Sequence, residues 1–104
     1  MDLVNLTPHR LNIHTDGGLR VLPSDGLARV ASVNTDADPI EDIPTVRTTR
    51  GEVTGLPAPQ EGVIYIVSGM VASAAPRADV FSPGDLVRDD SGRPIGCKGL
   101  RRSV

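Results

Sequence analysis

Short runs in which apolar and polar residues alternate predict that this chain consists mainly of β-strands. Residues 11–15 alternate in this way, and a second run at residues 19–22 follows Asp16-Gly17. Such alternation is typical of half-buried strands. Because glycine tolerates a positive φ, an Asp-Gly pair between two such runs favours a tight hairpin. Residues 27–33 are expected to form a third strand, which completes a meander.

The apolar pattern stops over residues 34–44, where acidic residues and two prolines dominate. This composition predicts an exposed acidic loop that acts as a solvated connector. The β-branched residues at 45–49 then favour a strand that residues 52–54 continue. Residues 55–59 contain two prolines and predict a rigid, extended break.

Residues 62–67 form the most apolar run of the chain. Continuous rather than alternating hydrophobicity favours a central strand that is covered on both faces. The following residues 70–75 have the composition of a short helix. Ser68 is well placed to cap this helix by accepting a hydrogen bond from its first turn, and Pro76 ends it.

The last part of the chain predicts a second hairpin, with closing strands at residues 86–88 and 94–97 joined by a turn at residues 90–92. The whole pattern amounts to about seven short strands and one short helix. We therefore expect a mainly β (α+β) fold, a small, partly closed antiparallel or mixed sheet or a barrel. A length of 104 residues leaves room for a single domain, 1–104.

Composition narrows this picture further. Aromatic residues make up only 2% of the chain, so the core must be built from aliphatic side chains and is expected to be thin. Cys97 is the single cysteine, which excludes an intramolecular disulfide and a cysteine-rich metal site. The N-terminus lacks the pattern of a signal peptide, and no apolar run is long enough to span a bilayer, so a cytoplasmic location is expected. A net charge of −2 makes duplex nucleic acid an unexpected partner.

Several short motifs resemble those of a group of small proteins encoded by bacteriophages and mobile elements, notably of actinobacteria. The similarity covers most of the chain except residues 34–44, and it implies an origin without assigning a role to any residue. The motifs are Asn5-Leu6-Thr7-Pro8-His9, Gly55-Leu56-Pro57, Tyr65-Ile66-Val67-Ser68, Arg77-x-Asp79 and Val87-Arg88-Asp89.

The region between residues 68 and 89 is the first candidate for a ligand site. Ser68 and Gly69 would let a ligand approach the backbone closely where the central strand meets the helix. Arg77 and Arg88 could supply guanidinium groups to a phosphate, while Asp79 or Asp89 could hold a ribose hydroxyl or orient an arginine. These residues together predict a hollow for a nucleotide-like anion. The alternative is a helix cap with structural Arg–Asp pairs that join loops.

Thr7 and His9 form the second candidate, because a histidine beside a rigid proline can act as a base or a ligand. The alternative is that both residues bond to the local backbone before the first alternating strand. His14 lies five residues from His9, which on one strand would place the two rings on opposite faces and disfavours a metal site. No cofactor-binding motif and no nucleophile motif is present, and Cys97 is expected to be a small buried apolar residue.

These observations favour a non-catalytic accessory protein of a phage or mobile element, one that binds a nucleotide-like anionic ligand or a host protein. The first alternative is a structural or assembly protein that forms a homo-oligomer, as a virion or adaptor component, because edge strands and a thin core favour self-association. The second alternative is a small hydrolase that uses His9 with an aspartate.

Overall fold

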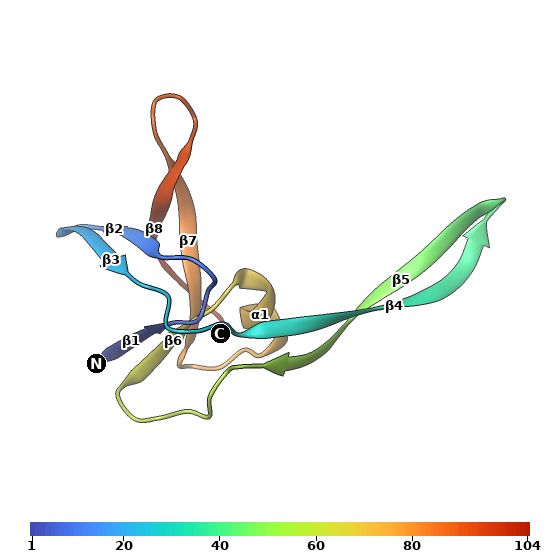
Figure 1. The fold of residues 1–104 in the computed structure, drawn as a ribbon, viewed down its shortest axis with the longest axis horizontal. Helices are drawn as coiled ribbons and strands as arrows, with labels where there is room; N and C mark the ends of the chain where they lie inside the picture. The colour runs from blue at the N-terminus through green and yellow to red at the C-terminus, as the bar shows by residue number, and fades with distance from the viewer.

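Six strands form one curled mixed sheet in the computed structural model, which describes residues 1–104 (Figure 1). Their order across the sheet is β1-β6-β7-β8-β2-β3. Two further strands, β4 and β5, pair only with each other. The elements in chain order are β1 (Asp2–Asn5), β2 (Leu11–Thr15), β3 (Gly18–Leu22), β4 (Arg29–Ile40), β5 (Ile43–Thr54), β6 (Val63–Ile66), α1 (Gly69–Ala74), β7 (Val80–Arg88) and β8 (Pro94–Arg102). The mainly β fold with one short helix is therefore confirmed.

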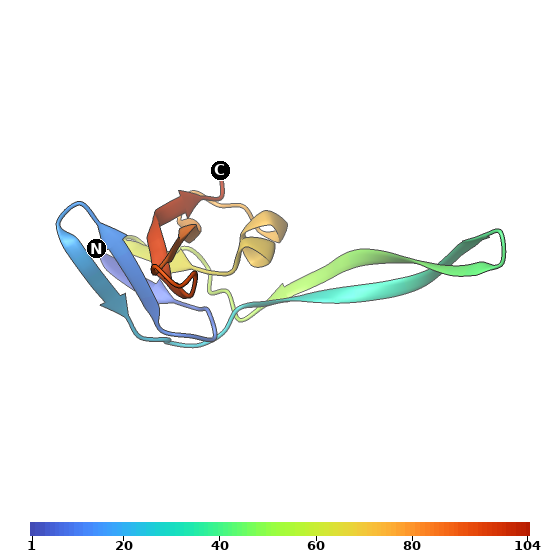
Figure 2. The ribbon, with the colours of Figure 1, turned by 90° about the horizontal axis from the view of Figure 1, so that it is seen from above.

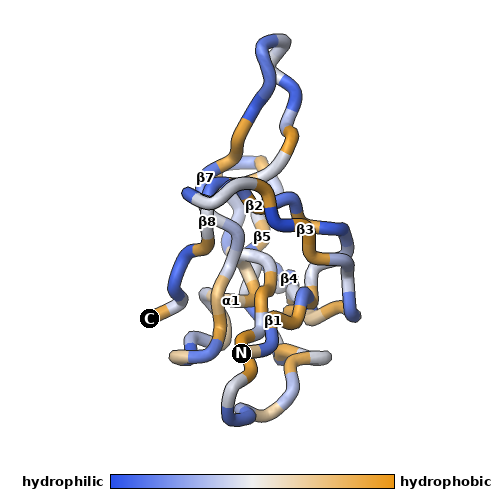
Figure 3. Tube along the Cα trace, turned by 90° about the vertical axis from the view of Figure 1, so that its left-hand side faces the viewer, coloured by the Kyte–Doolittle hydropathy of each residue, from blue (hydrophilic) through white to orange (hydrophobic).

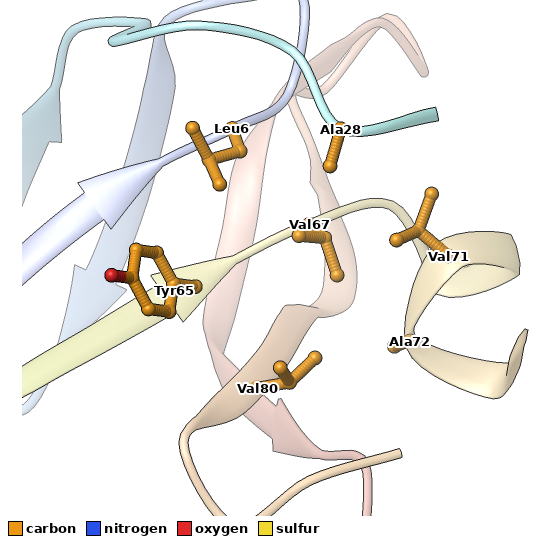
Figure 4. Packing of buried hydrophobic residues seen from close by; sticks show 7 residues of the cluster. All are labelled: Leu6, Ala28, Tyr65, Val67, Val71, Ala72 and Val80. Carbon is orange, nitrogen blue, oxygen red and sulfur yellow. The ribbon is translucent and has the colours of Figure 1, made fainter. Parts of the chain in front are cut away.

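The core lies where β6 meets α1 and the start of β7. Strand β6 is paired in parallel with β1 on one side and with β7 on the other. Its consecutive residues Tyr65 and Ile66 point to opposite faces and are both buried, which confirms the prediction of a strand covered on both faces. Its continuous apolar sequence follows from this position, since side chains on both faces must leave water. Seven buried side chains form the cluster shown in Figure 4: Leu6, Ala28, Tyr65, Val67, Val71, Ala72 and Val80.

Helix α1 begins directly after this strand, as predicted. The Ser68 hydroxyl accepts a hydrogen bond from the Val71 backbone N–H at 3.3 Å, which satisfies one donor of the first turn. Val71 and Ala72 are the buried residues of the helix, and they pack into the core. No helix of this structure has the length and apolar character needed to cross a membrane.

Two hairpins occur where the sequence predicts them. Strands β2 and β3 pair around Asp16-Gly17, and β7 pairs with β8 around the turn that contains Ser91 and Gly92. The second hairpin is longer than predicted, because β7 already begins at Val80. Pro83 is tolerated within β7 because the pairing of β6 with β7 ends at Phe81, so the missing N–H of Pro83 deprives no neighbouring strand of a bond. Strand β1 was also missed, which raises the total to eight strands.

The prediction of a strand at residues 27–33 is confirmed from Arg29 onward, but this strand does not form a meander with β3. The prediction that residues 34–44 form a loop is wrong. Both segments belong to the β4–β5 hairpin, with a turn at Glu41 and Asp42. This hairpin, called the arm from here on, projects far from the sheet (Figures 1 and 2). Residues 34–44 are almost all exposed, in agreement with the prediction, but they are held in strand conformation by their partners in β5.

Threonines and a register irregularity explain why an acidic, proline-containing segment forms a strand. Partners such as Thr35 with Arg47 and Asn34 with Thr48 lie opposite each other, and the Thr48 hydroxyl donates to Asn34 Oδ1 at 2.7 Å. β-Branched residues favour this conformation. Pro39 falls between the register positions Ala37 and Ile40, where the ladder is interrupted, so it removes no regular strand hydrogen bond.

Candidate functional site

Arg77 and Asp79, the first predicted ligand pair, bind each other. The Arg77 guanidinium donates to both carboxylate oxygens of Asp79, at 2.9 Å from Nε and 2.8 Å from Nη2. Its Nη1 donates to the Pro57 carbonyl oxygen at 3.0 Å. The hydrogen bond from Arg77 lowers the pKa of Asp79, against the opposing effect of partial burial. The pair therefore joins the segment before β7 to the extended break at residues 55–59.

Arg88 and Asp89, the second predicted pair, organise the turn of the β7–β8 hairpin. Arg88 Nη1 donates to the Gly92 carbonyl oxygen at 2.7 Å. Asp89 Oδ1 accepts bonds from the Ser91 backbone N–H and hydroxyl and from the Arg93 backbone N–H. The Ser91 hydroxyl and these backbone donors lower the pKa of Asp89. Such side-chain bonds to the following backbone are typical of an Asx turn.

The structure does not bring the two arginines into a common hollow. Arg77 precedes β7 and Arg88 ends it, and a strand of this length spans about 30 Å. Ser68 and Gly69 line two different hollows, neither of which includes Arg77 or Arg88. The alternative interpretation fits Ser68, which caps the helix, and the Arg77–Asp79 pair. Arg88 and Asp89 do not form such a pair, because each bonds to the turn of the hairpin instead.

Thr7 and His9 lie around the buried side chain of Asn5, which sequence reasoning had not identified as important. Asn5 Oδ1 accepts from the Thr7 backbone N–H at 3.0 Å and from the Thr7 hydroxyl at 2.6 Å. Asn5 Nδ2 donates to the backbone carbonyl oxygens of His9 at 2.9 Å and of Leu22 at 3.0 Å. An asparagine two residues before a Thr-Pro step was the signal, because Asn side chains often bond the backbone two residues on.

His9 also lines the largest hollow of the molecule, of about 720 Å³, between the start of β2 and the outer part of the β7–β8 hairpin. We call it the β2–β8 hollow. Leu86 and Ile95 line it with exposed fractions of 55% and 42%, which are high for large aliphatic side chains. Figure 3 shows apolar positions on both strands just below the hydrophilic turn of this hairpin. The lining consists of His9, Arg10, Leu11, Asn12, Pro83, Leu86, Pro94, Ile95, Gly96 and Cys97.

Cys97 and His9 thus line the same hollow, although nothing in the sequence indicated this. The Cys97 thiol is buried and donates to the Gly99 carbonyl oxygen at 3.6 Å, and no hydrogen bond connects it to His9. A nucleophilic thiol requires a base within hydrogen-bond reach. The structure contains no cluster of three or more His, Cys, Asp or Glu side chains that could hold a metal ion. The surface of the hollow is mostly apolar, with Leu11, Leu86 and Ile95 among its lining residues.

The arm is the second surface that stands out. Four of its aliphatic side chains are about half exposed or more, with fractions from 47% to 64%: Val33, Ile40, Ile43 and Val46. Ile40 and Ile43 form a cross-strand pair that encloses the turn. Residues 30–46 carry four carboxylates and no Lys or Arg. The far end of the arm is therefore both apolar and strongly acidic.

Comparisons of this chain with protein families, with curated proteins and with solved structures find no match. Its function is therefore inferred from the geometry and charge of the two surfaces themselves.

Proposed function

We propose that this protein is a non-catalytic assembly protein that forms homo-oligomers through its arm. In the setting that the motif resemblance implies, it would be a virion or adaptor component of a phage or mobile element in the host cytoplasm. The observation that carries the proposal is the arm itself, a hairpin of two twelve-residue strands with its far end in solvent.

A hairpin of this kind needs a partner surface. An isolated two-stranded hairpin is at best marginally stable in water. Only Val30 and Val53, at the base of the arm, pack against the core cluster. Both outer edges of the hairpin also present unpaired backbone groups, which invite pairing or coverage by another chain. A partner that covers the arm would stabilise the hairpin and would also bond or shield these backbone groups.

The energetics favour self-association. Only 13 of the 104 residues are buried, so the isolated chain has a small core to stabilise it. Full burial of an exposed aliphatic side chain contributes about 1.5–3 kcal/mol, and the four side chains of the arm, which are about half exposed, would each contribute roughly half of that. This gain would offset part of the translational and rotational entropy lost on association.

Sedimentation velocity over a wide concentration series tests the proposal. We expect the full chain to sediment above the monomer mass, and a variant in which residues 33–49 are replaced by Asn-Gly to be monomeric. This shortened arm keeps Val30 and Val53, and its turn follows the Ser32–Arg50 pair, where Asn-Gly favours a tight hairpin. Circular dichroism checks that the shortened variant is folded. A strictly monomeric full chain at near-millimolar concentration contradicts the proposal.

A second candidate function, the binding of a nucleotide-like anion through its phosphate, is favoured by a different hollow. Arg101 and Arg102 line a hollow of about 170 Å³ together with the predicted residue Gly69 and the hydroxyl-bearing Ser73, Ser82 and Ser103. This volume is below the range of about 300–1,000 Å³ that encloses a small organic ligand, so only the phosphate would be enclosed. Arg102 lies over the Phe81 ring, with its guanidinium carbon 5.4 Å from the ring centroid.

A thermal-shift measurement with inorganic phosphate, mononucleotides and cyclic dinucleotides tests this second function. A ligand that binds the folded state raises the melting temperature, and Arg102→Ala should remove the shift. Arg20→Ala, an exposed arginine on β3, is the control. The absence of a shift with every probe contradicts anion binding and leaves the assembly proposal unaffected.

A further inference from the structure

We infer that the tip of the arm of one copy docks into the β2–β8 hollow of a second copy. The tip, residues 39–44, carries the Ile40–Ile43 pair, the acidic turn between them and a proline on each side. This inference rests on the proposed self-association and names the two surfaces that meet. The proposed contact is heterologous, because the surface used by one copy, the tip, differs from the surface used by the other copy, the hollow.

The tip has the shape and polarity of an anchor. Ile40 and Ile43 are directly opposite each other and are 64% and 58% exposed. Glu41 adopts a φ of 55° in the turn, a conformation that non-glycine residues adopt rarely. Neighbouring prolines restrict the backbone on both sides. The tip therefore presents two aliphatic side chains on a short, conformationally restricted loop.

The hollow matches this anchor in size and in character. Its volume of about 720 Å³ lies within the range of about 300–1,000 Å³ typical of sites that enclose a small ligand. Leu11, Leu86 and Ile95 supply its aliphatic surface. Large exposed aliphatic side chains grouped in a hollow are typical of interaction sites.

Charge is complementary across the proposed contact. Asp36, Asp38, Glu41 and Asp42 give the far end of the arm an uncompensated negative charge. The hollow contains no carboxylate, and Arg10 is its one permanently charged lining residue. Such complementarity orients partners and suppresses incorrect pairing.

Only another copy can bring the two surfaces together. The arm extends away from the sheet on the side opposite to the β2–β3 hairpin, and both views show its tip far from β2 and from the β7–β8 hairpin, whose residues line the hollow (Figures 1 and 2). The tip of one chain therefore cannot reach the hollow of the same chain while the arm keeps this conformation.

A complementation experiment tests the contact in the full chain. One variant disables the tip (Ile40→Asp with Ile43→Asp), and another disables the hollow (Leu86→Asp). Each should weaken self-association by more than about tenfold, since a carboxylate would enter an apolar contact. An equimolar mixture should form a heterodimer, because one variant retains its hollow and the other its tip. Misfolding cannot produce this recovery.

Leu19→Asp is the matched control, since Leu19 is 56% exposed on β3 and Leu86 is 55% exposed. It should associate like the unmodified protein. If Leu86→Asp also associates like the unmodified protein while the tip variant is monomeric, the arm binds elsewhere, so the contact is refuted and the assembly proposal stands. Two monomeric variants that do not combine refute the contact as well. A monomeric unmodified protein overturns both proposals.

Discussion

At the residue scale, Asn5 connects the turn after β1, the approach to β2 and the end of β3. Its side chain is fully buried, and its two ends bond to Thr7 and to the carbonyl oxygens of His9 and Leu22. The Asn5 backbone carbonyl oxygen accepts from the Asp25 N–H at 2.8 Å. The turn after β1, the approach to β2 and the segment after β3 are therefore fixed by one amide.

We predict that Asn5→Ala lowers the free energy of unfolding by about 2–4 kcal/mol, because several buried backbone groups lose their partners at once. Urea denaturation followed by circular dichroism measures the change. Asn12→Ala is the control, since the half-buried Asn12 makes one long bond, 3.4 Å to the Ile95 carbonyl oxygen. Equal effects of the two substitutions would contradict the role given to Asn5.

The Arg77–Asp79 pair predicts a dependence of stability on pH. The pKa of Asp79 is lower in the folded protein than the value of about 3.9 expected when unfolded. The resulting stabilisation is therefore complete well above pH ~4 and is lost as the pH falls through the lowered pKa. Asp79→Asn should cost about 1 kcal/mol at neutral pH, and this difference should shrink toward zero in acid.

Denaturation at a series of pH values measures this difference. Asp85→Asn is the matched control, because Asp85 pairs with Arg101 at the same distance of 2.8 Å. The side chains of Asp85 and Arg101 are 85% and 63% exposed, whereas those of Asp79 and Arg77 are only 18% and 26% exposed. Exposed pairs contribute little, so this substitution should have only a small effect. A cost of Asp79→Asn that stays constant down to strongly acidic pH would exclude the assigned role.

At the element scale, the β2–β3 hairpin is attached to the sheet mainly through β8. The register of β2 with β8 includes only Ile13 with Cys97 and His14 with Lys98. Gly96 makes this contact possible, because a Cβ atom there would collide with the Asn12 carbonyl oxygen and press against the His14 ring. A single glycine thus controls how closely the two strands approach.

Gly96→Ala should separate β2 from β8 and reduce stability by about 1–3 kcal/mol, the usual cost of forcing an extra group into a packed contact. Hydrogen exchange should show faster exchange of the β2 and β3 amides. Gly17→Ala, in the exposed turn of the same hairpin, should leave exchange nearly unchanged, since its nearest neighbour would be Thr15 Oγ1 at 3.9 Å. Unaltered exchange in Gly96→Ala would show that the hairpin does not depend on this close approach.

Local patterns sufficed where the residue types themselves favour the observed structure. The Asp-Gly turn of the first hairpin, the continuous apolar run at residues 62–67 and the serine that caps the helix were predictable for this reason. The arm was not, although its two strands are adjacent in sequence, because its nine cross-strand pairs hold in strand conformation a segment whose acids and prolines favour a loop. The candidate site was also predictable only in part. Residue types indicated that Arg77 and Asp79 interact, but only the topology shows that Arg88 lies at the other end of β7 from Arg77.

At the scale of the whole molecule, the shape is elongated. The Cα radius of gyration is 16.8 Å, and the principal extents are 55, 40 and 22 Å. A compact chain of this length would have a radius of gyration of about 13 Å. The excess reflects the arm and the raised β7–β8 hairpin seen in Figure 1.

Small-angle X-ray scattering of the monomeric tip variant (Ile40→Asp with Ile43→Asp) should therefore give a radius of gyration close to 16.8 Å. The variant in which Asn-Gly replaces residues 33–49 should give a clearly smaller value. A radius near 13 Å for the tip variant would mean that the arm folds back onto the sheet.

The parallel pairing of β1 with β6 has a consequence during synthesis. Asp2 lies opposite Val63, so the partner of β1 leaves the ribosome about sixty residues later, a delay of roughly 3 to 12 s at about 5–20 residues per second. Throughout that interval the nascent chain can already form the β2–β3 and β4–β5 hairpins, whose strands are adjacent in sequence. The central sheet can close only afterwards. The β2–β8 hollow includes residues of β8, so the proposed docking of an arm tip would follow completion of the core.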